Sequence, residues 1–123
     1  MTGAEFLAAI CLALAAESAG PSTVRDGGRA VGWGQTWPCA VAEANRIMGR
    51  PVWTLADRAD IQAVEDMMGV TFRWHLSREP GLSVVDLACK WQMPSKRPPA
   101  RLAEVCARHR RRVEAIAERW GVR

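Results

Sequence analysis

An uncharged segment near the start of the chain constrains the fold more than any other feature. Residues 6–16 read FLAAICLALAA, and Glu17 follows directly. The segment is too short to span a bilayer. The residues before it contain Glu5 but no Lys or Arg, unlike a secretory signal. We therefore predict a deeply buried helix over residues 4–17, with no signal peptide and no stable insertion into a membrane.

Glu17 stands at the end of this predicted helix, where a carboxylate is unfavourable. The C-terminal end of a helix carries partial negative charge, so Lys or Arg is the usual residue there. Apolar surroundings disfavour the charged form of a carboxyl group, and we expect them to raise the pKa of Glu17. A carboxyl that stays protonated near neutral pH is what general acid catalysis needs, so Glu17 is a candidate catalytic residue.

The rest of the chain indicates a mostly α domain with one small β-hairpin. The hairpin is predicted at Asp26-Gly27-Gly28, because a tight turn needs residues that tolerate a positive φ. Thr54 is expected to be the N-cap of the next long helix. The predicted helices after the hairpin span residues 38–48, 58–77, 82–91 and 99–120, with a proline-rich loop, MPSKRPP, before the last. Because the chain of 123 residues has no internal repeat and no long linker, we expect one domain over residues 1–123.

Cysteine content and charge limit the partners that the chain can have. The four cysteines form no C-x-x-C pair, and we expect four buried, free thiols with no metal and no cofactor. The formal net charge of +4 suits an anionic partner. On the last predicted helix, His109 is expected to be a structural residue of the apolar stripe. The opposite face is expected to be a solvated row of arginines: Arg108, Arg110, Arg111, Arg112 and Arg119.

A second motif begins fifteen residues after Glu17, where residues 32–38 read GWGQTWP. Glycine permits close approach of a ligand to the backbone. The amide of Gln35 supplies both donors and an acceptor. The indole of Trp33 supplies a flat apolar face. This combination is typical of a groove for a sugar chain, because sugar rings have apolar faces and polar rims.

The two motifs together resemble the soluble lytic transglycosylase and goose-type lysozyme superfamily. In that family a helix ends in Glu-Ser, as Glu17-Ser18 does here. A Gly-x-x-Gln segment follows at the spacing of Gly32 to Gln35, with a proline soon after it, like Pro38. The family's third motif is aromatic-Asn-Gly before the final helix. It corresponds here to Trp91-Gln92-Met93, where Gln replaces Asn and Met replaces Gly.

The resemblance implies a lysozyme-like α+β fold and a glycosidase that cleaves peptidoglycan between N-acetylmuramic acid and N-acetylglucosamine. Glu17 would be the general acid, with Ser18 close to it. Gln35 would contact the sugar at the cleavage point, and Trp91 would line the site and support Glu17. Gly32, Trp33 and Gln92 complete the expected substrate-binding set.

Two chemical outcomes are open for such an enzyme, of which hydrolysis by a muramidase is expected and the reaction of a lytic transglycosylase is the alternative. In a muramidase, a second acid positions a water that hydrolyses the bond, and the pair of carboxyls lies about 6.5–9.5 Å apart when the enzyme inverts. Asp26 is the only acid in the loop near Glu17, and it is expected either to hold that water or to serve as a turn residue. In a lytic transglycosylase, a single carboxylate suffices and the substrate's own hydroxyl closes an anhydro ring.

Other function classes are also open. The basic last helix is compatible with a small nucleic-acid-binding protein. The altered Trp91-Gln92-Met93 segment is compatible with a protein that binds peptidoglycan without cutting it. We expect instead a monomeric, bacteriolytic enzyme without a nucleic-acid partner. In its short length and its free cysteines, the chain is similar to a phage endolysin. Such an enzyme is made in the cytoplasm of a bacterial host and acts on the cell wall.

Overall fold

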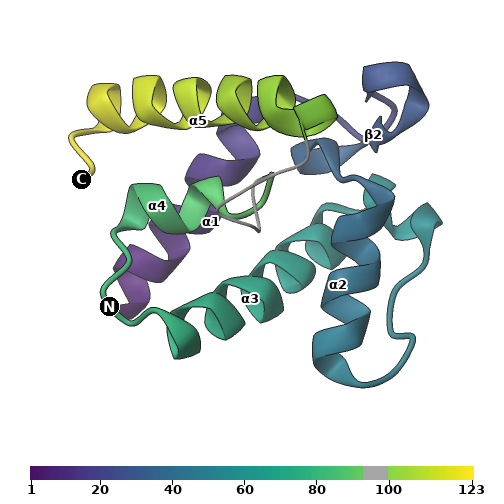
Figure 1. Cartoon of the computed structure of the whole chain (residues 1–123), viewed down its shortest axis with the longest axis horizontal. Helices are drawn as coiled ribbons and strands as arrows, with labels where there is room; N and C mark the ends of the chain where they lie inside the picture. Colours follow the sequence, from purple (N-terminus) through teal and green to yellow (C-terminus); the bar gives the residue numbers. More distant parts are fainter. Residues whose placement is uncertain (93–99) are drawn as a thin grey trace.

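The computed structural model describes residues 1–92 and 100–123, and within them a small hairpin lies beside a set of α-helices (Figure 1). The proline-rich loop predicted at 93–99 lies outside the described residues. The prediction of a mostly α domain with one small hairpin is confirmed. The regular elements are α1 (Gly3–Glu17), β1 (Val24–Arg25), β2 (Ala30–Val31), α2 (Pro38–Met48), α3 (Ile61–Arg78), α4 (Val84–Cys89) and α5 (Ala100–Trp120). Short 3-10 turns lie at Asp26–Gly28, Trp33–Gln35 and Leu55–Ala59.

Helix α1 is the buried element that its composition predicts. It begins at a capping box, in which the Thr2 hydroxyl accepts from the Glu5 amide and the Glu5 carboxylate accepts from the Thr2 amide. It ends at Ser18, which adopts the left-handed conformation with φ 44°. The helix packs against α4 and α5 and touches the Trp33–Gln35 turn. Its small alanine side chains let these neighbours approach its backbone closely.

The hairpin forms where the glycines predict it. Strands β1 and β2 pair antiparallel, with Val24 opposite Val31 and Arg25 opposite Ala30. The turn between them has positive φ at three successive residues, Asp26, Gly27 and Gly28. Two of the three are glycines, for which this conformation carries no steric cost.

Two helices have boundaries that differ from the prediction. Thr54 caps the short Leu55–Ala59 turn rather than the long helix. Helix α3 begins only at Ile61, because the Asp60 carboxylate accepts from the first free amides of that helix and its own backbone is extended. Helix α4 is shorter than predicted, Val84–Cys89, and Ser83 caps it.

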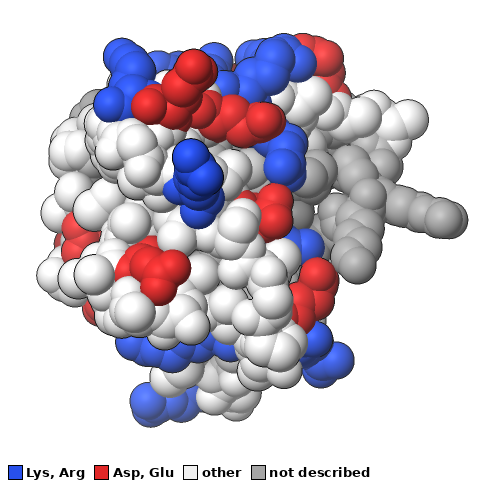
Figure 2. All heavy atoms as spheres, turned by 90° about the vertical axis from the view of Figure 1, so that its left-hand side faces the viewer, with Lys and Arg blue, Asp and Glu red and all other residues white. Residues whose placement is uncertain are grey.

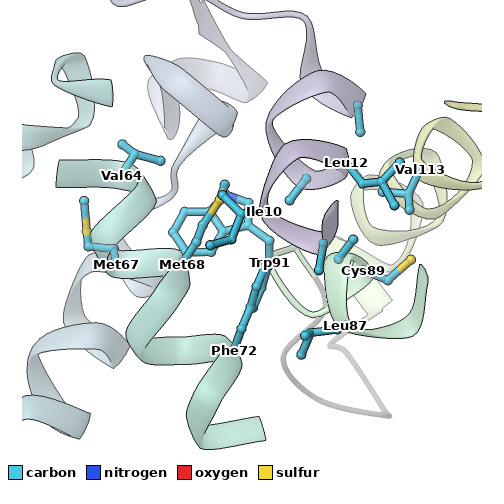
Figure 3. Packing of buried hydrophobic residues seen from close by; sticks show 14 of the residues in the cluster. Ile10, Leu12, Val64, Met67, Met68, Phe72, Leu87, Cys89, Trp91 and Val113 are labelled. Atoms are coloured by element: carbon cyan, nitrogen blue, oxygen red, sulfur yellow. The ribbon is translucent and has the colours of Figure 1, made fainter. Parts of the chain in front are cut away.

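The core lies between α1, α3, α4 and α5 (Figure 3). Phe72 and Trp91 meet edge to face, with ring centroids 6.5 Å apart. Met68 lies close to Trp91 in the same layer (Figure 3). Trp91 is therefore a core residue that ties the end of the α4 segment to α3.

The cysteines are free, but only two of the four are buried. Cys89 and Cys106 lie in the interior, whereas Cys11 and Cys39 are exposed. The prediction of four buried thiols is wrong, because Cys11 lies on the face of α1 that borders an open cavity and Cys39 lies in the first turn of α2. Among the residues that the structure describes, no helix is long and apolar enough to cross a membrane.

Candidate functional site

Glu17 lies at the junction of α1, α5 and the hairpin, and its side chain is engaged from two of these elements. It is 6% exposed. Its Oε1 lies 2.7 Å from Nδ1 of His109, and its Oε2 accepts a hydrogen bond of 2.7 Å from Nη1 of Arg112. The Arg25 guanidinium lies 3.9 Å from Oε2 and donates to the Glu17 backbone carbonyl at 2.7 Å. The carboxylate is thus surrounded by basic groups.

The basic groups change the proton affinity of this carboxyl. Burial raises the pKa of Glu17, but the hydrogen bond from His109 and the charges of His109, Arg112 and Arg25 together lower it by more. The net pKa lies below its ordinary value, so the prediction of a raised pKa is wrong. The apolar run before Glu17 predicted burial correctly, but it contained no information about the arginines and the histidine that reach the carboxylate from elsewhere.

The contacts of His109 fix where one proton lies. Nε2 of His109 is 3.1 Å from the carbonyl oxygen of Ala88, which can only accept, so Nε2 carries a hydrogen. The 2.7 Å contact between Nδ1 and Glu17 then needs a second hydrogen, because two unprotonated acceptors would repel each other at that distance. The pair therefore holds one shared proton, as imidazolium with carboxylate or as imidazole with carboxylic acid.

Asp26 occupies the hairpin turn and is tied to α5. Its Oδ1 accepts a hydrogen bond of 2.9 Å from Arg108. It has a positive φ of 53°, as a turn residue often has. Asp26 is thus a residue of the turn. It does not line either of the two cavities beside Glu17 that are described below.

The glycines of the GWGQ segment serve packing within the chain. Gly32 and Gly34 both have positive φ. A Cβ on Gly32 would collide with the backbone carbonyl of Arg58. A Cβ on Gly34 would lie 2.8 Å from Cε of Met68 and 3.1 Å from Nε1 of Trp91. The close approach expected for a ligand is therefore taken up by neighbouring parts of the chain.

Gln35, Trp91 and Gln92 hold this segment in place. Gln35 is 2% exposed, and its Nε2 donates to the carbonyls of Thr23 and Gly32. The indole of Trp91 donates to the Gly34 carbonyl at 3.0 Å, and Nε2 of Gln92 donates to the Gln35 carbonyl at 2.7 Å. These three predicted contact residues support the wall of the site from inside. The Oε1 of Gln35 is buried without a hydrogen-bond partner among the described residues.

Two adjoining cavities open beside Glu17. The larger, which we call the Trp33 cavity, has a volume of about 650 Å³, and the smaller, which we call the arginine pocket, has about 310 Å³. They share Ser18, Ile116 and Arg119. The Trp33 cavity is lined by Cys11, Leu14, Ala15, Ser18, Ala19, Trp33, Ile61, Ile116, Arg119 and Trp120. The arginine pocket is lined by Ala16, Glu17, Ser18, Arg25, Arg112, Ala115, Ile116 and Arg119.

Three of the predicted site residues line these cavities. Glu17, Ser18 and Trp33 line them, whereas Gly32, Gln35, Trp91, Gln92 and Asp26 do not. Ser18 is exposed, and its hydroxyl donates to the Ala15 carbonyl at 3.2 Å. Glu17 is the only carboxylate among the described residues that line the two cavities.

The arginine side chains of α5 reach solvent, as the sequence predicts, but most of their charges are paired. Four of its arginines pair with acidic side chains: Arg108 with Asp26, Arg110 with Asp86 and Glu114, Arg111 with Glu104, and Arg112 with Glu17. Basic and acidic side chains accordingly alternate along the upper edge of the molecule, where α5 lies (Figures 1 and 2). This pairing reduces the free positive charge that phosphates could use.

His109 and Arg112 are the site residues that sequence reasoning missed. His109 is 1% exposed on the apolar stripe of α5, and a buried histidine needs a polar partner. Glu17 at the end of the apolar helix α1 was an acid without an assigned partner in the sequence, so it was the natural candidate to pair with His109. Arg112 lies three residues after His109, so it faces the same neighbour.

Comparison of the chain with protein-family models, with curated proteins and with solved structures finds no match. The interpretation of the site therefore depends on its own geometry.

Proposed function

We propose that the chain is a lysozyme-like enzyme that cleaves the glycan strands of peptidoglycan, with Glu17 as the acid. One observation carries the proposal, namely that the buried Glu17 carboxyl lines a pocket that adjoins a larger cavity lined by the indole of Trp33. Trp33 lines the larger cavity, where an indole can stack on a sugar ring, and Ser18 lines both cavities. A proton source next to a sugar-sized groove is what glycosidic cleavage requires.

The shared proton of Glu17 and His109 is the proton to be donated. His109 is buried and cannot reach a substrate, so transfer proceeds through the Glu17 carboxyl. For this, Arg112 must leave Oε2, and its side chain is 42% exposed, so water can hydrate the guanidinium when the ion pair opens. The Glu17 carboxyl takes the shared proton from Nδ1 of His109 on Oε1 and turns so that this oxygen faces the cleft. It then donates the proton to the glycosidic oxygen as the bond from that oxygen to the anomeric carbon breaks.

The single carboxylate of the cleft favours ring closure over hydrolysis. Asp26 is held by Arg108 and lies outside the cavity linings, so it offers no second carboxylate to a water there. The substrate's own hydroxyl then attacks the anomeric carbon and returns its proton to Glu17. No water is consumed, and the product is an anhydro sugar, as in a lytic transglycosylase. A muramidase that hydrolyses the bond is the alternative outcome.

A second candidate function is the binding of peptidoglycan without cleavage. It is favoured by one observation: both oxygens of Glu17 are engaged by basic groups, which keep the carboxyl ionised. In that case the cleft would hold a sugar chain and the buried ion pair would serve stability alone.

Mass spectrometry of purified peptidoglycan after incubation with the chain distinguishes these functions. Anhydro-terminated fragments are expected, reducing ends would indicate hydrolysis, and intact strands would contradict enzyme activity. Glu17→Gln keeps the shape of the side chain and is expected to abolish cleavage. Glu104→Gln is the matched control, because Glu104 is an exposed acid paired only with Arg111 among the described residues, and cleavage should persist.

A further inference from the structure

The arginine pocket holds more positive charge than its one carboxylate neutralises. Arg25, Arg112 and Arg119 line it together with Glu17. Arg25 and Arg112 each contact Glu17 through Nη1, and their other N–H groups have no partner among the described residues. Arg119 is exposed and makes no hydrogen bond or ion pair with any residue that the structure describes. Glu17 neutralises at most one of the three guanidiniums, so at least two positive charges are in excess.

The three guanidiniums come from two elements and leave room between them. Arg25 belongs to β1, whereas Arg112 and Arg119 belong to α5. Residues seven apart lie on the same face of a helix, about 10 Å from each other along its axis. Ala115 lies between them in the pocket wall, and its side chain is a single methyl group. The long arginine side chains on either side of this gap can therefore converge on one anion.

The adjoining Trp33 cavity has an apolar wall. Large apolar side chains line much of it: Leu14, Trp33, Ile61, Ile116 and Trp120. Arg119 is the only charged residue among the described residues that line this cavity, and it borders the arginine pocket as well. The volumes of about 650 and 310 Å³ lie in the range of small-molecule sites. A ligand that fills both cavities therefore needs an anionic group at one end and an apolar body at the other.

We propose that the two cavities together bind a phosphate monoester with an apolar chain, the phosphoryl group in the arginine pocket and the chain in the Trp33 cavity. The proposal goes beyond the proposed function, because this ligand is not a glycan and its binding does not depend on cleavage. A phosphate monoester carries close to two negative charges above neutral pH and has three strong acceptor oxygens. It matches the excess charge and can accept from several guanidiniums at once, whereas a carboxylate has one charge and two oxygens.

Isothermal titration calorimetry of the whole chain at about pH 8, where the monoester is a dianion, tests the proposal. The probes are hexyl phosphate, hexanoate, hexanol and inorganic phosphate. Hexyl phosphate is expected to bind at least about tenfold more tightly than hexanoate or hexanol, since hydrogen bonds to a charged group contribute on that scale. It is expected to exceed inorganic phosphate at least about tenfold as well, because burial of two methylene groups already gives that factor. A smaller difference in any of these comparisons would overturn the proposal.

Vesicles distinguish a lipid from a soluble ester as the source of this chemistry. Phosphatidic acid carries a phosphate monoester on an apolar anchor, whereas the phosphate of phosphatidylglycerol is a diester. If hexyl phosphate binds as expected, sedimentation with phosphatidic acid vesicles but not with phosphatidylglycerol vesicles assigns a lipid as the ligand. Sedimentation with neither assigns a soluble ester to the same site.

Three variants locate the two ends of the ligand. Arg119→Gln removes an unpaired, exposed guanidinium and is expected to weaken binding of hexyl phosphate about tenfold. Trp120→Ala is expected to weaken hexyl phosphate about fivefold and to leave inorganic phosphate unchanged, because Trp120 lines only the larger cavity. Arg111→Gln is the matched control, because Arg111 lies on the same helix, is exposed and pairs with Glu104 outside the pocket.

Unchanged binding in Arg119→Gln, or an equal loss in Arg111→Gln, would contradict the assignment of the phosphoryl group. An equal loss of inorganic phosphate in Trp120→Ala would contradict the assignment of the chain. The probes contain no glycosidic bond and the readout is binding alone. Failure of this proposal is therefore distinguishable from failure to cleave peptidoglycan.

Discussion

Replacement of His109 by leucine tests how strongly the pair between α1 and α5 stabilises the fold. His109 is 1% exposed, and its loss leaves Oε1 of Glu17 and the carbonyl oxygen of Ala88 without their partner. Breaking a buried ion pair by removing one member costs about 3–5 kcal/mol. Because Arg112 still neutralises Glu17 from the solvent side, we expect the free energy of unfolding to fall by about 3 kcal/mol, the lower end of that range.

Urea denaturation followed by tryptophan fluorescence measures this loss. With a typical slope of about 1–3 kcal/mol per molar, the midpoint should move down by about 1–3 M. The double variant Glu17→Leu, His109→Leu removes both members of the pair, so its loss should be smaller than the sum of the single losses by about 2 kcal/mol. A fall below about 1 kcal/mol for His109→Leu, or strictly additive losses, would refute the reasoning.

Three further outcomes are expected. A lowered folded-state pKa means that the stabilisation from Glu17 is complete above its ordinary value of 4.5 and is lost as the pH falls through the folded value. The chain should therefore lose unfolding free energy on acidification below that pH more steeply than Glu17→Gln, and equal slopes in urea titrations would contradict this. Gly34→Ala combines a positive φ with collisions against two core side chains and should cost more than about 2 kcal/mol, whereas Gly49→Ala, with the same sign of φ and open space, should cost about 1 kcal/mol in the same melts. Exposed Cys11 should react with a thiol reagent in the folded chain, while Cys89, whose pKa burial raises to about 11, should react only after unfolding; similar rates would exclude this difference in access.

The fold could be predicted from the sequence because its elements are specified locally. The uncharged run at residues 6–16 has no stable position except the interior, and the double glycine at 27–28 permits the turn that closes the hairpin. Helix boundaries were predicted less accurately where two possible N-cap residues lie close together in the sequence. Thr54 and Asp60 are both good N-caps, and only packing decides that α3 starts after the second.

The candidate site could be predicted only in part, since its partners are distant in sequence. Glu17, Ser18 and Trp33 were identified from short motifs, and they line the cavities. The protonation of Glu17 depends on His109 and Arg112, which lie 92 and 95 residues away. No local pattern encodes contacts of that range, so the sign of the pKa shift required the structure.

The separation of these partners has a consequence for folding. Contacts between segments so far apart in sequence carry a large loop-closure cost and form late. Helix α1 and the hairpin are specified by neighbouring residues and bring Arg25 to Glu17, but His109 and Arg112 reach the carboxylate only when α5 docks. A chain with α5 undocked would therefore lack both hydrogen bonds to the Glu17 carboxylate. The electrostatic environment of Glu17 is complete only in the fully native state.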